Sequence, residues 1–109
     1  MSIPHAVSGQ PVDVRPLGEA LTGARSVALF KSDQLEVIRL VLPAGKAMPP
    51  HKVAGEITIQ CIEGSIAVTG EGSRQVLRPG ELLYLVGGAL HGVAAVEDAS
   101  ALLTIVLGK

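Results

Sequence analysis

Short apolar runs separated by glycine or proline recur along this chain, and they constrain its fold more than any other feature. No stretch keeps a helical period for more than about ten residues. With 13 glycines and 7 prolines among 109 residues, turn signals separate the runs as they do in all-β sandwiches and barrels. The expected strands cover residues 12–15, 26–31, 35–42, 56–62, 65–69, 75–77, 82–86, 91–96 and 101–107, with a turn at 49–50 and a helical turn within 17–24.

Two of these expected strands, residues 82–86 and 101–107, are almost continuously apolar. Strands of this kind are usually covered on both faces, since a strand with one face in water alternates apolar and polar residues. A chain of 109 residues makes one domain with a single core, so part of this apolar surface is expected to lie between subunits. We therefore expect a homodimer.

Charge and composition exclude several classes of partner. Nine basic and ten acidic residues give a net charge of -1, and one phenylalanine and one tyrosine are the chain's aromatic residues. The sequence therefore has neither the run of basic residues nor the aromatic residues for base stacking that are typical of nucleic-acid-binding proteins. No segment has the roughly 18 continuous apolar residues of a membrane span, and the N-terminus lacks a signal-peptide pattern. The single cysteine, Cys61, is consistent with a reducing compartment. We therefore expect a cytoplasmic protein with no nucleic-acid or membrane partner.

Residues 45–64, which read GKAMPPHKVAGEITIQCIEG, contain one of the three histidines, His51. A turn follows this histidine, and then a strand. Successive side chains of a strand point to opposite faces. Ile57, Ile59 and Cys61 therefore share one face, which is predicted to point into the interior of the sandwich or barrel.

This stretch and a second one at residues 80–95 resemble the two motifs of the cupin superfamily. Motif one reads G-x5-H-x-H-x(3,4)-E-x6-G, and motif two reads G-x5-P-x-G-x2-H-x3-N. The matching positions are Gly45, His51, Gly64, Gly80, Gly88 and His91. The resemblance covers most of the chain and implies a small, RmlC-like barrel, which is a double-stranded β-helix, or jelly roll, of two packed antiparallel sheets. Residues 21–109 are expected to form this barrel, and residues 1–20 an N-terminal arm of the same domain.

In the cupin family two histidines and a glutamate of motif one join the motif-two histidine around a divalent metal. Here Val53 stands at the second histidine position and Ile57 at the glutamate position. Glu56 is one residue away, on the opposite face of a regular strand, and only a bulge would turn it inward. A complete zinc site gains roughly 10–16 kcal/mol, and half of that corresponds to a Kd of about micromolar to near-millimolar. The resemblance therefore predicts no tightly bound cofactor, and at most a weak zinc, nickel or iron at His51 and His91.

Three interpretations of His51 and His91 follow. We favour a barrel that binds a small organic ligand, as a sensor or carrier, with the histidines as hydrogen-bonding or acid–base groups. The second interpretation is a metal site completed by Glu56, Gln60, Cys61 or water. The third is structural, with both histidines satisfied by backbone or water and the barrel filled by its own side chains. The ligand pocket is expected to be lined by Val53, Ile57, Ile59, Cys61 and Tyr84.

The competing function is enzymatic. His51 and His91 would then act as acid and base in an isomerase or lyase, or would hold the metal of a cupin-type oxygenase. Because one fold hosts many chemistries, the resemblance does not specify a substrate.

Overall fold

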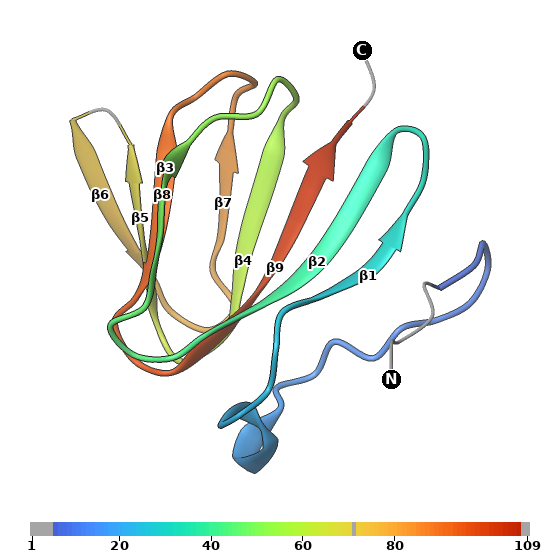
Figure 1. Ribbon diagram of the computed structural model, residues 1–109, viewed down its shortest axis with the longest axis horizontal. Helices are drawn as coiled ribbons and strands as arrows, with labels where there is room; N and C mark the ends of the chain where they lie inside the picture. Colours follow the sequence, from blue (N-terminus) through green and yellow to red (C-terminus); the bar gives the residue numbers. More distant parts are fainter. Residues whose placement is uncertain (1–5, 71, 108–109) are drawn as a thin grey trace.

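The computed structural model describes residues 6–70 and 72–107 and folds them into two antiparallel sheets (Figure 1). Over these residues the regular structure consists of strands and one short 3-10 turn, so the predicted all-β class is confirmed. No helix in this range is long and apolar enough to cross a membrane. The elements are η1 (Gly18–Leu21), β1 (Val27–Lys31), β2 (Leu35–Leu42), β3 (Ala47–His51), β4 (Ile57–Glu63), β5 (Ile66–Gly70), β6 (Ser73–Leu77), β7 (Leu82–Leu85), β8 (His91–Ala95) and β9 (Ala99–Val106).

The strand order is that of a double-stranded β-helix. One sheet runs β1-β2-β9-β4-β7 and the other runs β3-β8-β5-β6. The consecutive strands β1 and β2 form an antiparallel pair within one sheet, and so do β5 and β6. Between all other consecutive strands the chain crosses to the opposite sheet. The two sheets therefore wind together into the predicted jelly-roll barrel, with the connecting loops at its ends (Figure 1).

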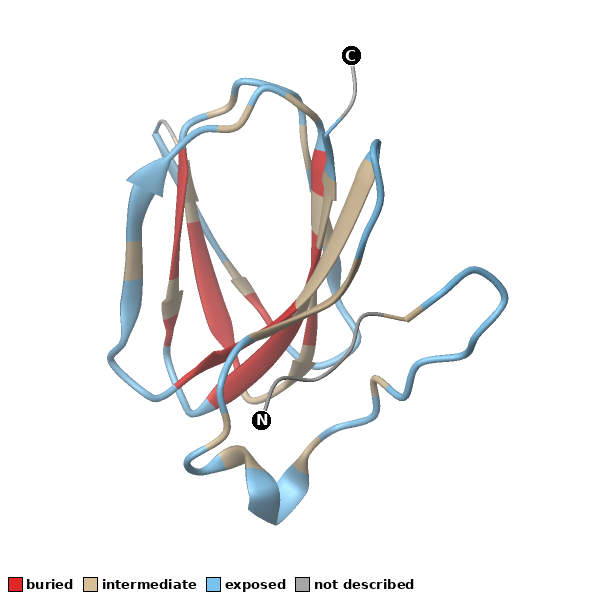
Figure 2. Ribbon diagram, turned by 45° about the vertical axis from the view of Figure 1, so that its right-hand side comes forward, coloured by how far each residue is buried: buried red, intermediate tan, exposed pale blue. Residues whose placement is uncertain are grey.

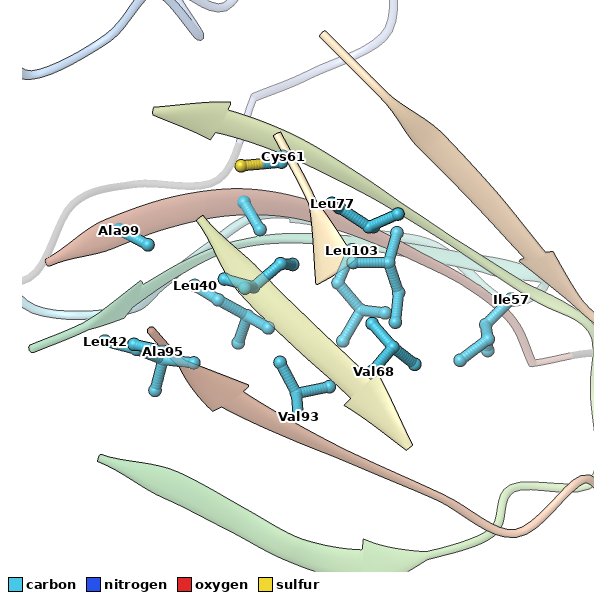
Figure 3. Close-up of a cluster of buried hydrophobic side chains, with 13 residues drawn as sticks. Leu40, Leu42, Ile57, Cys61, Val68, Leu77, Val93, Ala95, Ala99 and Leu103 are labelled. Carbon is cyan, nitrogen blue, oxygen red and sulfur yellow. The ribbon is translucent and has the colours of Figure 1, made fainter. Parts of the chain in front are cut away.

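The hydrophobic core fills the space between the inner faces of the two sheets. Figure 2 shows the buried residues gathered on the strands that face each other, and Figure 3 shows their side chains. Burying one such aliphatic side chain stabilises the fold by about 1.5–3 kcal/mol. The buried cluster consists of Leu40, Leu42, Ile57, Ile59, Cys61, Ile66, Val68, Leu77, Val93, Ala95, Ala99, Ala101 and Leu103.

The side chains of β4 alternate as the sequence predicts. Ile57, Ile59 and Cys61 are buried, whereas Thr58 and Gln60 are half-buried on the outer face of the sheet. This alternation follows from the two-residue repeat of a strand. It gives the barrel interior an apolar row along β4.

The glycines of the two motifs have backbone conformations that other residues rarely adopt. The φ angles of Gly45, Gly64, Gly80 and Gly88 are +81°, +72°, +91° and +80°. Gly64 carries a second constraint, because a Cβ there would lie 2.0 Å from the carbonyl oxygen of Asp98. The framework of both motifs is therefore required by the path of the backbone, whatever the chemistry of the site.

The turn predicted at Pro49 and Pro50 is wrong, because both residues lie within β3. β3 is an edge strand of its sheet, and proline is tolerated there since its missing N–H can face away from the ladder. The register of β3 against β8 shifts between Met48 and His51. The two prolines therefore interrupt the pairing without turning the chain.

The strand predicted at residues 12–15 is also wrong. The guanidinium group of Arg39, a residue only 7% exposed, donates hydrogen bonds to the carbonyl oxygens of Asp13 and Arg15, both at 2.9 Å. The Arg39 side chain of β2 thus holds the arm (blue in Figure 1) by hydrogen bonds to its backbone, at the residues where a strand was expected. The first five residues of the predicted arm lie outside the described residues, and the boundary at residue 20 stays a prediction.

Candidate functional site

The topology brings the two predicted histidines side by side. His51 ends β3, His91 begins β8, and the two residues are direct partners in the ladder between these strands. Their ring centroids lie 4.5 Å apart, with the ring planes inclined by 50°. His91 is only 4% exposed and shares the inner face of β8 with Val93, whereas His51 is exposed. The pair therefore reaches from the barrel interior to the surface at one end of the barrel.

Both imidazole rings are held by the backbone of their own chain segment. His51 Nδ1 lies 3.2 Å from the carbonyl oxygen of Pro49. His91 Nδ1 lies 3.1 Å from the carbonyl oxygen of Ala89. Each acceptor is two residues before its histidine, so the two rings are held by the same kind of contact. The sequence did not predict these two carbonyl partners, because a backbone carbonyl is present at every residue and cannot be recognised from the residue type.

The residues around the pair do not complete the metal site of the family. Val53 and Ile57 occupy two ligand positions, and Ile57 is 3% exposed in the core. Within residues 6–70 and 72–107, no group of three or more histidine, cysteine, aspartate or glutamate side chains is placed to hold a metal ion. Two imidazoles do not satisfy a divalent ion that prefers four or more ligands. The donor set therefore does not fit a tightly bound metal.

The alternative ligands named from the sequence lie elsewhere. Gln60 pairs with Leu82 and Leu102 on the outer side of the sheet. Cys61 is four residues beyond Ile57, or about 13 Å further along β4 at 3.3 Å per residue. Neither side chain is brought to the histidine pair.

Glu56 points away from the barrel interior. Its carboxylate accepts a hydrogen bond from the Tyr84 hydroxyl at 2.5 Å, and both residues are exposed. Tyr84 pairs with the outward-facing Thr58 and is 53% exposed. Tyr84 therefore lies on the outer face of the sheet, and the expectation that it faces the interior is wrong. The inward positions of β7 are Leu83 and Leu85, which pack against the core.

The rim beside the histidines is built from two closely packed loops. The loop after β3 and the loop before β8 meet where Gly88 N donates to Val53 O at 2.8 Å. A Cβ on Gly87 would lie 2.4 Å from the carbonyl oxygen of Ala54, and a Cβ on Gly55 would lie 1.8 Å from that of Val106. Gly87 lets the two loops touch each other, and Gly55 lets the first loop touch the end of β9. The loops that follow His51 and precede His91 are therefore held in register.

Cys61 is a core residue with little nucleophilic character. Its side chain is fully buried, and its Sγ lies 3.6 Å from the carbonyl oxygens of Glu63 and Gly64. Burial raises the pKa of the Cys61 thiol, and the negative charge of Glu81 raises it further. Because the thiolate is the reactive species, Cys61 is suited to packing.

A hollow on the surface lies away from the histidine pair. It has a volume of about 570 Å³ and lies between the arm and β1, where Val7, Val12 and Phe30 line it. It therefore does not bear on the ligand pocket predicted at Val53, Ile57, Ile59 and Cys61. That pocket stays a prediction.

A family model described as a Cupin domain matches residues 38–107, which is well over half of the chain. The chain therefore belongs to the cupin family, and the predicted membership is confirmed. No protein of curated function matches the sequence significantly. The match begins within β2 and ends just after β9, so it contains both histidines and all four motif glycines.

Solved structures support the same fold. An RmlC-like cupin from Desulfovibrio desulfuricans is 28% identical, with a TM-score of 0.69 over 78% of this chain and 85% of that one. A conserved Streptococcus pyogenes protein of unknown function is 19% identical, with a TM-score of 0.77 over 100% and 96%. The DMSP lyase DddQ from Ruegeria pomeroyi is 23% identical, with a TM-score of 0.67 over 77% of this chain and 46% of that one. The last two likenesses concern the fold alone.

Proposed function

We propose that this cupin binds a small organic molecule at the His51–His91 pair, as a sensor or carrier, and does not depend on a tightly held metal. The observation that carries the proposal is the contact between the two imidazoles, whose ring centroids lie 4.5 Å apart. Two oriented polar groups at the end of an apolar core are the usual composition of a ligand site. The side chains expected to face the ligand are Val53 and Ile57.

The apolar residues at the two other ligand positions favour an organic ligand. Ile57 lies opposite Leu85 and Ile105 in the register of its sheet, at the end where β3 ends and β8 begins. All three side chains belong to the core or pack against it. An apolar ligand body gains about 25 cal/mol for each Å² that it buries. Valine and isoleucine in place of a histidine and a glutamate therefore favour an organic body over an ion.

A second part of the proposal is that two copies associate through the surface of β7, formed by Leu82, Tyr84 and Val86. These residues are 62%, 53% and 59% exposed. β7 is an edge strand, and residues 82–86 carry no charge to discourage pairing. In a two-fold dimer the same patch faces itself, so the exposed apolar side chains of Leu82 and Val86 would be buried against their copies. A cytoplasmic location remains a prediction that depends on the lone Cys61.

Binding and metal content are tested on one preparation. Protein purified without added metal is dialysed against a chelator, and its zinc, nickel and iron are measured by elemental analysis. The proposal expects far less than one metal ion per chain. A fragment library is then screened by NMR, and the expected hits shift the imidazole resonances of His51 and His91. Near-stoichiometric metal after dialysis, or hits that leave both histidines unmoved, would sink the proposal.

A further inference from the structure

The backbone contacts of the His51–His91 pair fix which ring nitrogen carries the proton. Pro49 and Ala89 face the two Nδ1 atoms with carbonyl oxygens, at 3.2 and 3.1 Å. A carbonyl oxygen can only accept a hydrogen bond, so each Nδ1 must donate. A neutral imidazole has one N–H group. The Nε2 of each ring is therefore left as an acceptor with a free lone pair.

The Nε2 atom of His91 is in contact with solvent although the residue is only 4% exposed. No hydrogen bond from residues 6–70 and 72–107 reaches this nitrogen, and in the same range no buried side-chain nitrogen or oxygen lacks a partner. Its surface must therefore be accessible to solvent. The small exposed part of His91 includes the one polar atom that is still free to bind.

The acidic and sulfur-containing side chains of the described residues are not grouped with these acceptors. Among the described carboxylates and thiols, none joins the two histidines in a cluster. Glu56, the nearest carboxylate in the motif, is bonded to Tyr84 on the outer face. The interior beside His91 is apolar, with Val93 on the same strand face and Ile57 on the opposite sheet. The site is therefore a pair of acceptors beside an apolar wall.

We infer that the ligand is a neutral molecule that donates a hydrogen bond from a hydroxyl or N–H group carried on an apolar body, of which a phenol is the simplest form. This inference rests on the proposed function, because it specifies what the same histidine pair would select. A carboxylate or phosphate brings only acceptors when ionised, so its oxygens would face the Nε2 lone pairs without a proton between them. Burying such an anion without a donor is costly.

Three aromatic probes of similar size test the inference on the full chain. Phenol offers a donor, anisole replaces it by a methyl ether, and benzoate carries a negative charge. Dissociation constants of the three probes are measured by NMR titration at pH 8. One net hydrogen bond predicts that phenol binds up to about tenfold more tightly than anisole. Benzoate is expected to bind more weakly than either.

The three probes separate failure of the inference from failure of the proposed function. If anisole or benzoate binds as well as phenol, and the histidine resonances respond, the ligand class is wrong while the site stands. If no probe moves either histidine, the site itself is wrong and the inference falls with it. Long-range ¹H–¹⁵N correlations of the free protein give an independent check. A proton on Nε2 in both rings would overturn the inference without any ligand.

Two variants connect the preference to His91. His91→Phe keeps a ring of similar size and removes one of the two acceptors, so the preference for phenol over anisole should shrink. His91→Gln places an amide oxygen near the Nε2 position, and part of the preference for phenol should return. Because the comparison of phenol with anisole is made first on the unaltered chain, a variant that fails to fold leaves the inference testable.

Discussion

The carboxylate of Glu63 accepts a hydrogen bond from the backbone amide of Leu17 at 2.9 Å, although the two residues are 46 positions apart. The same carboxylate accepts from Gly18 N at 3.0 Å and from the Ser100 hydroxyl at 2.5 Å. Burial alone would raise the pKa of Glu63, but these hydrogen bonds and the positive charge of Arg39 lower it below the ordinary 4.5. One ionised side chain thus joins the arm to β4 and β9.

Glu63→Gln should weaken this junction. An amide accepts more weakly than a carboxylate and presents an N–H group to donors, so we expect the free energy of unfolding to fall by about 1–3 kcal/mol at pH 7. Urea unfolding followed by circular dichroism measures the change. Glu19→Gln is the matched control, because Glu19 is exposed and has no side-chain hydrogen bond to the described residues.

The same contact predicts a pH dependence. The pKa of Glu63 is lower in the folded chain than in the unfolded chain, so its stabilisation is complete above about 4.5 and is lost as the pH falls through the folded value. The difference in unfolding free energy between the unaltered chain and Glu63→Gln should therefore shrink below pH 4.5. A difference that stays constant down to acid pH would mean that ionisation of Glu63 does not hold the arm.

The contact between Gly87 and Ala54 predicts a loss of stability in a loop beside the site. Gly87→Ala would place a Cβ 2.4 Å from the Ala54 carbonyl oxygen, and relieving that overlap should cost about 1–3 kcal/mol of unfolding free energy. Gly70→Ala is the control, because its Cβ would meet only ordinary contacts, the nearest being the Ser73 hydroxyl at 3.5 Å. Equal midpoints for the two variants in urea would show that the loops separate easily.

The burial of Cys61 predicts that its thiol is protected in the folded protein. Burial raises its pKa and hides the sulfur, so Ellman's reagent at pH 8 should react only through opening of the barrel. In denaturant the reagent should release one equivalent per chain, since the chain has one cysteine. Rapid reaction of the native protein would contradict the packing of β4.

The proposed dimer predicts that one added charge on the β7 surface separates the subunits. Leu82→Lys places like charges opposite each other in a two-fold interface, which is destabilising. Light scattering after size exclusion should then show a monomer, where the unaltered chain gives a dimer. Lys31→Glu, on the edge strand at the other side of the sheet, is the control and should leave the mass unchanged. A monomeric unaltered chain would refute the dimer.

The sequence predicts which face of a strand is buried only where apolar and polar residues alternate along that strand. β4 alternates apolar and polar residues, so its inward side chains, Ile57 and Ile59, were predicted correctly. The run 82–86 is apolar throughout except for Tyr84, so its sequence does not say which face is inside. The pairing of Tyr84 with Thr58 decides this. Pairing between distant strands is a property of the assembled sheet and has no local signal.

At the histidine pair, too, some features could be predicted from the sequence and others could not. The resemblance to the cupin motifs implies that His51 and His91 are neighbours, and in the structure their ring centroids lie 4.5 Å apart. The role of Arg39 could not be predicted in this way. From the sequence alone, Arg39 is expected to be a solvated charged residue on the face of a strand. It is buried because carbonyl groups of a distant arm come to it. Contacts with backbone atoms depend on the fold and carry no residue-type pattern.

The last prediction tests whether Glu56 faces outward, which decides whether it can be a metal ligand. The Tyr84 hydroxyl donates to the Glu56 carboxylate, and this hydrogen bond raises the pKa of Tyr84 above the ordinary 10.0, with burial and the negative charge of Glu56 adding to the effect. The chain has one tyrosine and no tryptophan, so the ultraviolet absorbance of tyrosinate reports Tyr84 alone. Ionisation should occur at higher pH in the unaltered chain than in Glu56→Gln. Glu36→Gln, on β2, should leave the Tyr84 titration unchanged. Identical titrations in the unaltered chain and Glu56→Gln would place Glu56 away from Tyr84 and reopen the question of a third ligand beside the two histidines.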